Sequence, residues 1–410
     1  PHTENLCPLK TPGLIRPVSF LLFFAANMST AFLPVYGESL WHEGSLIPKE
    51  MASALPLSAE LLFAALTAFA GGFIVNRVSA RNLCIFGALM YVAGNALCGT
   101  APTLGILILG NSVCGIGGGC FATSINSYVA EYAEEKQRNS GFAGYNAAYL
   151  AGMNCGTVVG SAISERFGAR EAFLGASIVA LASVFFIVKH MDKRIVATER
   201  LEKSTSKHSV REMLTFLFRP GILRYFFLLL IPYLVCTSFL SYFFPLFGEE
   251  NSLTSTQISS AFLVSGVISI YLGPIITDIM IDKCGAKLSA VIASFIYVFS
   301  FLLFTLHQNI AVCFVIVGLL AIADSFGLTA QSVEYSSLDE VTEMGEGKAM
   351  GISSAFENSA YTLGPVLFSG LFMLIGYAGG IGLIGIIMLA LLLLYVFAEF
   401  RRFRGKRVSS

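Results

Sequence analysis

The feature that most constrains this sequence is the recurrence of long apolar stretches along almost its whole length. Each is about 18 residues or longer, the length at which an α-helix crosses the hydrocarbon core of a bilayer. The composition agrees, since 55% of the 410 residues are hydrophobic and 13% are charged. The stretches lie near residues 14–38, 51–75, 83–101, 103–129, 141–163, 171–189, 223–247, 255–280, 288–306, 310–335, 349–374 and 376–399. We therefore predict an all-α membrane protein with twelve transmembrane helices.

Little of the chain remains for a water-soluble catalytic domain, and the motifs of common enzymes do not occur in it. The nine cysteines are scattered without a CxxC pair, and there is no HExxH, GxxxxGK[ST] or GxSxG motif. Basic and acidic residues balance at 26 each, so no net charge favours nucleic acid. We expect no enzyme activity, no metal site, no nucleic-acid partner and no cofactor other than a proton gradient.

The basic residues indicate how the chain crosses the membrane. Of the 26 Lys and Arg residues, only Lys49, Arg166 and Arg170 fall in the odd-numbered connectors between stretches. The positive-inside rule then places both termini and the central loop in the cytoplasm. We expect a multi-pass protein of a bacterial inner membrane, with bundles over residues 1–188 and 222–410 joined by a cytoplasmic loop over residues 189–221.

The two halves of the sequence repeat each other. FLPVYGE over residues 32–38 corresponds to FFPLFGE over residues 243–249, and the proline and the glycine occupy the same positions in both segments. Glu131 corresponds in the same way to Asp339. Parallel repeats of this kind predict two six-helix bundles related by an axis along the membrane normal, with a binding site between them near the midplane.

The segment after the second stretch resembles the signature of the major facilitator superfamily, which reads roughly G-x-x-x-D-R-x-G-R-K. The chain has Gly72 followed by NRVSAR over residues 76–81, with Asn76 in place of the aspartate and Ser79 in place of a glycine. A second copy, DKCGAK over residues 282–287, keeps the aspartate and the glycine. The resemblance covers essentially the whole chain and implies a transporter with two pseudo-symmetric six-helix bundles.

In that family the basic residues of this element pair with an acid at the end of the fourth or tenth span and close the cytoplasmic side. The resemblance implies a cytoplasmic gate formed by Arg77, Arg81, Glu131, Asp282, Lys283, Lys287 and Asp339. We expect two ion pairs in it, Arg77 with Glu131 and Lys283 with Asp339. The alternative is that these are ordinary positive-inside charges.

Other patterns of the family are incomplete here. Asn111 stands where proton-coupled members often carry an arginine, which argues against proton transport through the first half. The antiporter pattern of the fifth span is present as Gly152, Gly156 and Gly160 but lacks its proline, and small residues at this spacing also serve close helix packing. A fainter resemblance to facilitator-type modules fused to bacterial signalling enzymes keeps a ligand-sensing role open.

Three acids lie deep within the apolar stretches, where a charge is costly enough to suggest a function. They are Glu60, Asp324 and Glu357, and no lysine or arginine lies at a comparable depth. Two polar stripes follow helical spacing, one made of Asp324, Gly327, Gln331 and Glu334 and the other of Ser353, Ser354, Glu357 and Tyr361. We predict that Asp324 and Glu357 together bind a proton and a cation, one of them keeping its proton near neutral pH. The alternative is that these acids only bond to neighbouring helices.

Polar and aromatic residues on the first, fifth and seventh stretches are the remaining candidates for a binding site. They are Asn27, Tyr145, Asn146, Tyr149, Asn154, Ser238 and Tyr242. Aromatic rings beside carboxylates suit an organic cation. We expect a monomeric secondary transporter in the lipid bilayer that moves a small organic solute, cationic or amphipathic, by antiport or symport with protons. The alternatives are a facilitated carrier of a neutral solute and a ligand-sensing module.

Overall fold

All regular structure in the described part of the chain is helical. The computed structural model describes residues 15–45, 47–74, 78–130, 135–191, 215–344 and 346–408, and no strand occurs in these ranges. Eight helical stretches within them are long and apolar enough to cross a membrane. The predicted all-α, multi-pass membrane class is therefore confirmed.

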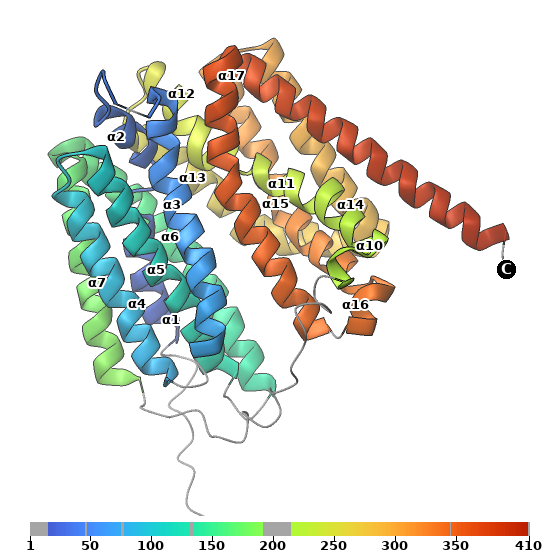
Figure 1. Ribbon diagram of the computed structural model, residues 1–410, viewed down its shortest axis with the longest axis horizontal. Coiled ribbons are helices and arrows are strands. Elements are labelled where there is room, and N and C mark those ends of the chain that lie inside the picture. Colours follow the sequence, from blue (N-terminus) through green and yellow to red (C-terminus); the bar gives the residue numbers. More distant parts are fainter. Residues whose placement is uncertain are drawn as a thin grey trace, which may run out of the picture. The chain divides into compact units, whose positions relative to one another are not determined.

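The six stretches predicted in the first half fall in helices (Figure 1). The first is shared by α1 (Ile15–Asn27) and α2 (Leu33–Ser39), and the others fall in α3 (Lys49–Ile74), α4 (Ala80–Gly99), α5 (Leu104–Ala130), α6 (Glu135–Phe167) and α7 (Ala169–His190). Pro34 lies in the first turn of α2, where its missing N–H has no intrahelical partner to lose. Ser79, which replaces a glycine of the family signature, caps α4 by accepting a hydrogen bond from the Asn82 N–H at 3.3 Å.

The six stretches of the second half also fall in helices, but these are less regular. They are α10 (Pro220–Arg224), α11 (Ile231–Cys236), α12 (Phe244–Glu250), α13 (Ser255–Val267), α14 (Gly273–Leu306), α15 (Ile310–Ser336), α16 (Asp339–Met344) and α17 (Glu346–Val408). The helix α17 holds two predicted stretches, and α14 holds the end of the eighth stretch and the whole of the ninth; the parts are joined at a kink, at Gly285 (φ 75°) in α14 and at Gly376 (φ 70°) in α17. The two arms of α17 meet at one end in Figure 1. Left-handed backbone at both kinks favours glycine.

Three wide, π-helical turns interrupt the seventh and eighth stretches, and each ends two residues before a proline. They cover Tyr225–Leu230, Phe239–Phe243 and Ile268–Leu272, ahead of Pro232, Pro245 and Pro274. A proline ring collides with the carbonyl group four residues earlier in a regular α-helix. That carbonyl lies inside the wide turn in all three cases, so the turn removes the collision. The prolines thus divide the seventh span into short segments.

The chain forms two compact units. The first unit contains Pro1–Leu33 and Ala59–Thr205, and the second unit contains Pro34–Ser58 and Ser206–Ser410. The second unit thereby includes a segment that the sequence placed in the N-terminal bundle. Tyr242 links this segment to the rest of the second unit, because its hydroxyl lies 2.7 Å from the Ser53 hydroxyl and donates to the Glu50 carbonyl oxygen at 3.1 Å. The predicted loop over residues 189–221 lies mostly outside the described residues.

Close helix packing in the first unit accounts for the small residues of the fifth predicted stretch. A Cβ atom on Gly156 would collide with the carbonyl oxygen of Phe24, and one on Gly160 with that of Met28. The glycines therefore let α6 approach α1 to backbone contact. Packing alone accounts for these glycines.

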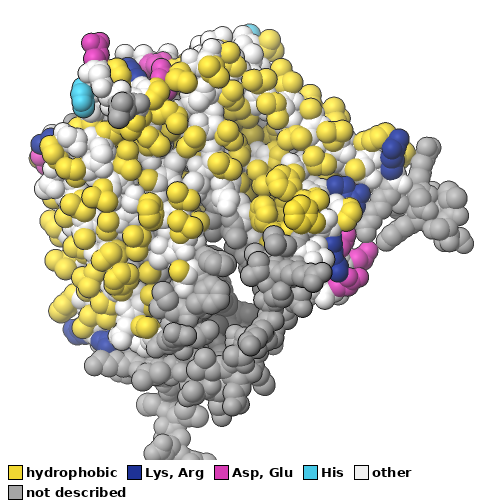
Figure 2. All heavy atoms as spheres, viewed as in Figure 1, with side chains coloured by type: hydrophobic (Ala, Val, Ile, Leu, Met, Phe, Trp, Pro, Cys, Tyr) yellow, Lys and Arg dark blue, Asp and Glu magenta, His cyan; other side chains and the backbone are white. Residues whose placement is uncertain are grey.

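The outside of the described helices is apolar. Large hydrophobic side chains stand exposed, among them Phe185, Ile178, Tyr271 and Leu374. On the face shown in Figure 2, hydrophobic side chains are spread over the whole described surface, and the few charged ones lie towards its margins. Such a surface suits lipid rather than water. Below, the helix ends that the sequence predicts to face the cytoplasm are called the inner ends.

Candidate functional site

Asp324 is held by two tyrosines from neighbouring helices. Its carboxylate on α15 accepts a hydrogen bond from the Tyr233 hydroxyl of α11 at 2.7 Å. The Tyr297 hydroxyl of α14 donates to both carboxylate oxygens, at 2.9 and 3.0 Å. Both tyrosines are fully buried and pack edge to face, with ring centroids 4.7 Å apart. The recorded partners of this acid are therefore neutral hydroxyl donors.

Glu357 has a different set of neighbours. Its carboxylate on α17 accepts a hydrogen bond from the Ser353 hydroxyl at 2.9 Å, one turn earlier in the same helix. Tyr225 and Tyr335 lie within electrostatic reach of it. The structure records no hydrogen bond between Asp324 and Glu357 within the residues it describes. The two acids predicted as one centre thus have separate partners, and their joint role stays a prediction.

Several aromatic residues lie near Glu357 in the chain or in space. Phe356, the residue before it, stacks on Phe226 at a centroid distance of 4.3 Å. Tyr225 and Tyr335 pack together at 4.9 Å. A carboxylate among aromatic faces can accommodate an organic cation, because the rings attract the cation and the acid neutralises it.

Gln331 lies on the same face of α15 as Asp324 and is 1% exposed. Its backbone carbonyl accepts a hydrogen bond from the Tyr225 hydroxyl at 3.0 Å. Neither atom of its side-chain amide has a hydrogen-bond partner among the residues that the structure describes. A buried amide without a partner is rare enough to require an explanation.

The remaining candidates of the second unit serve helix contacts. Ser238 is buried against Gly364, where a Cβ atom would collide with the serine hydroxyl. Tyr242 bonds to Ser53 and to the Glu50 backbone. Tyr361 lies within electrostatic reach of Tyr233. A ligand-contacting role of these residues stays a prediction.

Glu60 is the embedded acid of the first unit. It lies on α3 within electrostatic reach of Tyr91 and Cys114, and a Cβ atom on Gly115 would collide with its backbone carbonyl. Tyr145 and Tyr149 pack edge to face on Phe23, at centroid distances of 5.6 and 4.7 Å. The same tyrosines lie within electrostatic reach of Tyr91. This acid therefore shares an aromatic environment with two of the predicted site residues.

The two asparagines predicted for the first-unit site bond within their own helices. Asn27 donates its amide to the Phe23 carbonyl and Asn154 donates to the Leu150 carbonyl, both at 2.8 Å. The Asn27 backbone carbonyl in turn accepts from Thr157 at 3.2 Å, which joins α1 to α6. The side chain of Asn146 lies outside the described residues.

Part of the predicted gate can be placed. Arg77 and Glu131 lie outside the described residues. Arg81 is buried and donates to the Val188 carbonyl of α7 at 2.5 Å. Asp282 and Lys283 are exposed, and Asp339 begins α16. The predicted pairs stay predictions, and among the gate residues of the second unit the structure records ion pairs of Lys287 with Glu334 and Glu399.

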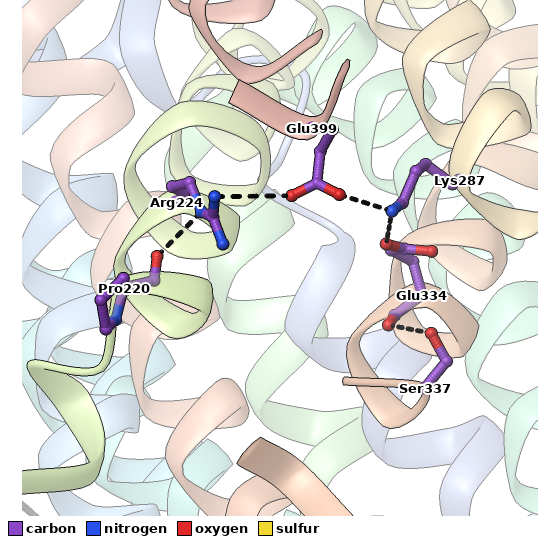
Figure 3. Close-up of polar contacts among 6 residues, drawn as sticks. All are labelled: Pro220, Arg224, Lys287, Glu334, Ser337 and Glu399. Carbon is purple, nitrogen blue, oxygen red and sulfur yellow. Dashed lines mark hydrogen bonds and ion pairs between the residues drawn. The ribbon is translucent and has the colours of Figure 1, made fainter. Parts of the chain in front are cut away.

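Lys287 belongs to an ion-pair network that joins four helices at their inner ends (Figure 3). Its ammonium group lies 2.7 Å from Glu399 of α17 and 3.3 Å from Glu334 of α15. Glu399 also lies 4.0 Å from Arg224 of α10. The Glu334 side chain is 7% exposed, whereas that of Lys287 is 47% exposed. A nearly buried carboxylate is thus connected to solvent through a half-exposed lysine.

Sequence reasoning did not identify Tyr233, Tyr297, Arg224 or Glu399. The tyrosines are embedded in apolar stretches and carry no spacing signal of their own. Gly327 could have indicated one of them, because it is the position of the polar stripe that has no side chain. A Cβ atom there would lie 2.6 Å from the Tyr233 hydroxyl oxygen.

Comparison with models of known protein families shows which family this chain belongs to. Residues 17–341 match the family model of the Major Facilitator Superfamily. The chain belongs to this superfamily. The resemblance found in the sequence motifs is therefore confirmed.

Several curated transporters of the superfamily are similar over part of the chain. The uncharacterized MFS-type transporter YtbD of Bacillus subtilis (strain 168) is 26% identical over 47% of this chain and 47% of its own length. The galactose-proton symporter of Escherichia coli (strain K12) is 26% identical over 38% of this chain and 36% of its own. The methylenomycin A resistance protein of Streptomyces coelicolor is 30% identical over 28% of this chain and 24% of its own. Each match spans less than half of the relative's length.

Solved structures show the same fold. A POT family transporter in complex with a thioalcohol-conjugated peptide has a TM-score of 0.76 at 13% identity, covering 95% of this chain and 96% of that chain. A D-xylose-proton symporter has a TM-score of 0.68 at 16% identity, covering 92% of this chain and 96% of that chain. At such identities the likeness concerns the fold alone.

Proposed function

We propose that this protein is a secondary active transporter that moves a small organic solute across a membrane by alternating access. Membership of the superfamily supports this, as do relatives named as symporters and resistance proteins. The membrane-embedded acids fit an ion-coupled carrier better than an enzyme. We further propose that it acts as a monomer in a bacterial inner membrane with both termini in the cytoplasm, as the distribution of Lys and Arg indicates.

Proton coupling is proposed at Asp324, and the geometry of this residue carries the proposal. Its carboxyl group lies in an apolar helix and is held by Tyr233 and Tyr297. Two hydroxyl donors stabilise a carboxylate in the hydrocarbon region, whereas the surrounding apolar helices favour its protonated form. A group balanced between both forms can take up and release a proton during a transport cycle.

The proposed solute is a cation or an amphipathic molecule. Glu357 supplies a negative charge near Tyr225 and Tyr335, and aromatic rings next to a carboxylate suit an organic cation. A neutral polar solute is the second candidate, because the amide of Gln331 could bond to a hydroxyl-bearing molecule. The similarity to the galactose-proton symporter favours this candidate as well.

Flux measurements on the purified protein in liposomes test this function. Tetraphenylphosphonium and tetraethylammonium represent cations, and galactose and xylose represent neutral solutes. We expect flux of at least one cation in an imposed pH gradient, and its loss when nigericin collapses the gradient. Asp324→Asn should abolish the gradient-driven part. Asp278→Asn, which changes an exposed aspartate of α14, should not.

Three results would redirect the proposal. Flux of galactose or xylose alone in the gradient would favour the neutral solute. Flux that persists after nigericin would indicate a facilitated carrier. Binding of a probe without any flux would indicate a ligand-sensing module.

A further inference from the structure

A continuous series of polar groups runs along one face of α15. Asp324, Gly327, Gln331 and Glu334 follow one another at steps of three, four and three residues. Such steps keep residues on one helix face, about 5–6 Å apart at neighbouring Cβ atoms. From Asp324 to Glu334 the helix rises by about 15 Å. The face thus connects the embedded acid to the ion-pair network at the inner end.

Gly327 does not interrupt this series. The position has no side chain, and the Tyr233 hydroxyl occupies the space beside it, 2.6 Å from where a Cβ atom would lie. The same hydroxyl donates to Asp324 at 2.7 Å. The Tyr233 hydroxyl of α11 therefore supplies a polar group beside Gly327, where α15 has no side chain.

Gln331 is the decisive member of the series. It is buried, and its amide has neither a donor nor an acceptor partner within the described part of the chain. An unpaired buried amide is unfavourable, so it requires a group that both donates and accepts hydrogen bonds. Water does both, and one water molecule can bridge polar groups separated by about one helical turn.

The groups that face the embedded end of the series come from three further helices. Tyr233 of α11 and Tyr297 of α14 bond to Asp324. Cys236 of α11 lies within electrostatic reach of both tyrosines, and Tyr361 of α17 lies within reach of Tyr233. None of these groups carries a fixed positive charge that would exclude a proton.

The inner end of the series is different. Glu334 faces Lys287 of α14, and Tyr395 and Glu399 of α17 lie within electrostatic reach of it. Lys287 is half exposed and Glu334 is nearly buried. In the middle, Tyr225 bonds to the backbone of Gln331. The series thus begins at a nearly buried carboxylate that is paired with a half-exposed lysine, and it ends at a carboxylate inside the membrane.

We propose that this face of α15 is a proton path from the inner end of the second unit to Asp324, with Gln331 holding the connecting water. A proton from the inner solution binds the Glu334 carboxylate and passes to water at Gln331. That water gives a proton to the Tyr233 oxygen while the Tyr233 hydroxyl gives its own to Asp324. Only O–H bonds form and break, and the net change is one proton moved. The path rests on the proton coupling proposed above.

The test follows the protonation of Asp324 after a rapid drop in pH, by time-resolved infrared spectroscopy of the protein in lipid nanodiscs. The Asp324 signal is the carboxylic acid band that Asp324→Asn removes. Gln331→Leu removes both amide atoms at similar volume, and we expect it to slow the rise of this band at least tenfold while leaving its final amplitude unchanged. Gln331→Met should do the same if the leucine variant fails to fold.

Ser332→Ala is the matched control, because this exposed neighbour on α15 donates a hydrogen bond within its own helix, to the Leu328 carbonyl. It should leave the rate unchanged. Equal rates in the wild type and the Gln331 variants would overturn the path while leaving proton coupling at Asp324 intact. The absence of any band that depends on Asp324 would overturn both the path and the coupling.

Discussion

Tyr297 places a single hydroxyl between the two carboxylate oxygens of Asp324, at 2.9 and 3.0 Å. In the hydrocarbon region no bulk water replaces a lost donor, so each such contact matters for the stability of the fold as well as for transport. A functional role of Asp324 could be predicted from its depth in an apolar stretch. Its partners could not, because which helices lie beside α15 depends on tertiary packing.

At this scale we expect Tyr297→Phe to lower the free energy of unfolding by about 1–2 kcal/mol, since it removes a hydrogen bond but keeps the ring. Tyr271→Phe removes the same atom from an exposed ring and should change stability by less than about 0.5 kcal/mol. Unfolding of both variants in detergent, followed by intrinsic fluorescence, makes the comparison. Equal losses in the two variants would show that the Asp324 contact contributes nothing to stability.

Among the helices, α17 has a kink whose backbone conformation depends on one glycine. Gly376 has a left-handed backbone (φ 70°), and no atom lies within 4 Å of the place that a Cβ atom would take, so only conformation constrains it. Gly370 lies six residues earlier in the same helix, also with open space beside it. Because neither glycine is crowded, the pair compares a left-handed backbone position with a helical one.

We expect Gly376→Ala to destabilise the protein by about 1–2 kcal/mol, because alanine disfavours this backbone conformation. Gly370→Ala should be neutral or stabilising by up to about 1 kcal/mol, since alanine favours a helix. Thermal unfolding of the two variants under one set of conditions distinguishes them. A Gly376→Ala variant as stable as Gly370→Ala would contradict the left-handed kink.

The order of the spans could be predicted from apolar length alone, because a membrane leaves the backbone few alternatives to a helix. The interruptions were harder to predict. Pro232, Pro245 and Pro274 are visible in the sequence, but a proline can produce either a kink or a wide turn. The partners of Lys287 were also missed, since Glu399 is about 110 residues away in sequence and belongs to a different helix.

Over the whole molecule, the two repeats differ in their chemistry. Asp324 and Glu357 of the second repeat correspond to Ile116 and Tyr149 of the first, in the same register in which Asp339 corresponds to Glu131. The tyrosine pair at Asp324 and the ion-pair network at Lys287 both belong to the second unit. The proposed coupling chemistry thus lies in the second copy of the repeat. A contribution of Glu60 and its neighbouring tyrosines in the first unit to solute binding stays a prediction.

The most direct test of the central claim compares two kinds of flux in Asp324→Asn liposomes, using a radiolabelled solute that the wild type concentrates in a pH gradient. Concentrative uptake requires a proton to bind and leave in each cycle, whereas counterflow exchange of solute for solute requires no net proton movement. We predict that Asp324→Asn abolishes concentrative uptake and keeps counterflow. Retention of concentrative uptake at the wild-type level would contradict proton coupling at Asp324.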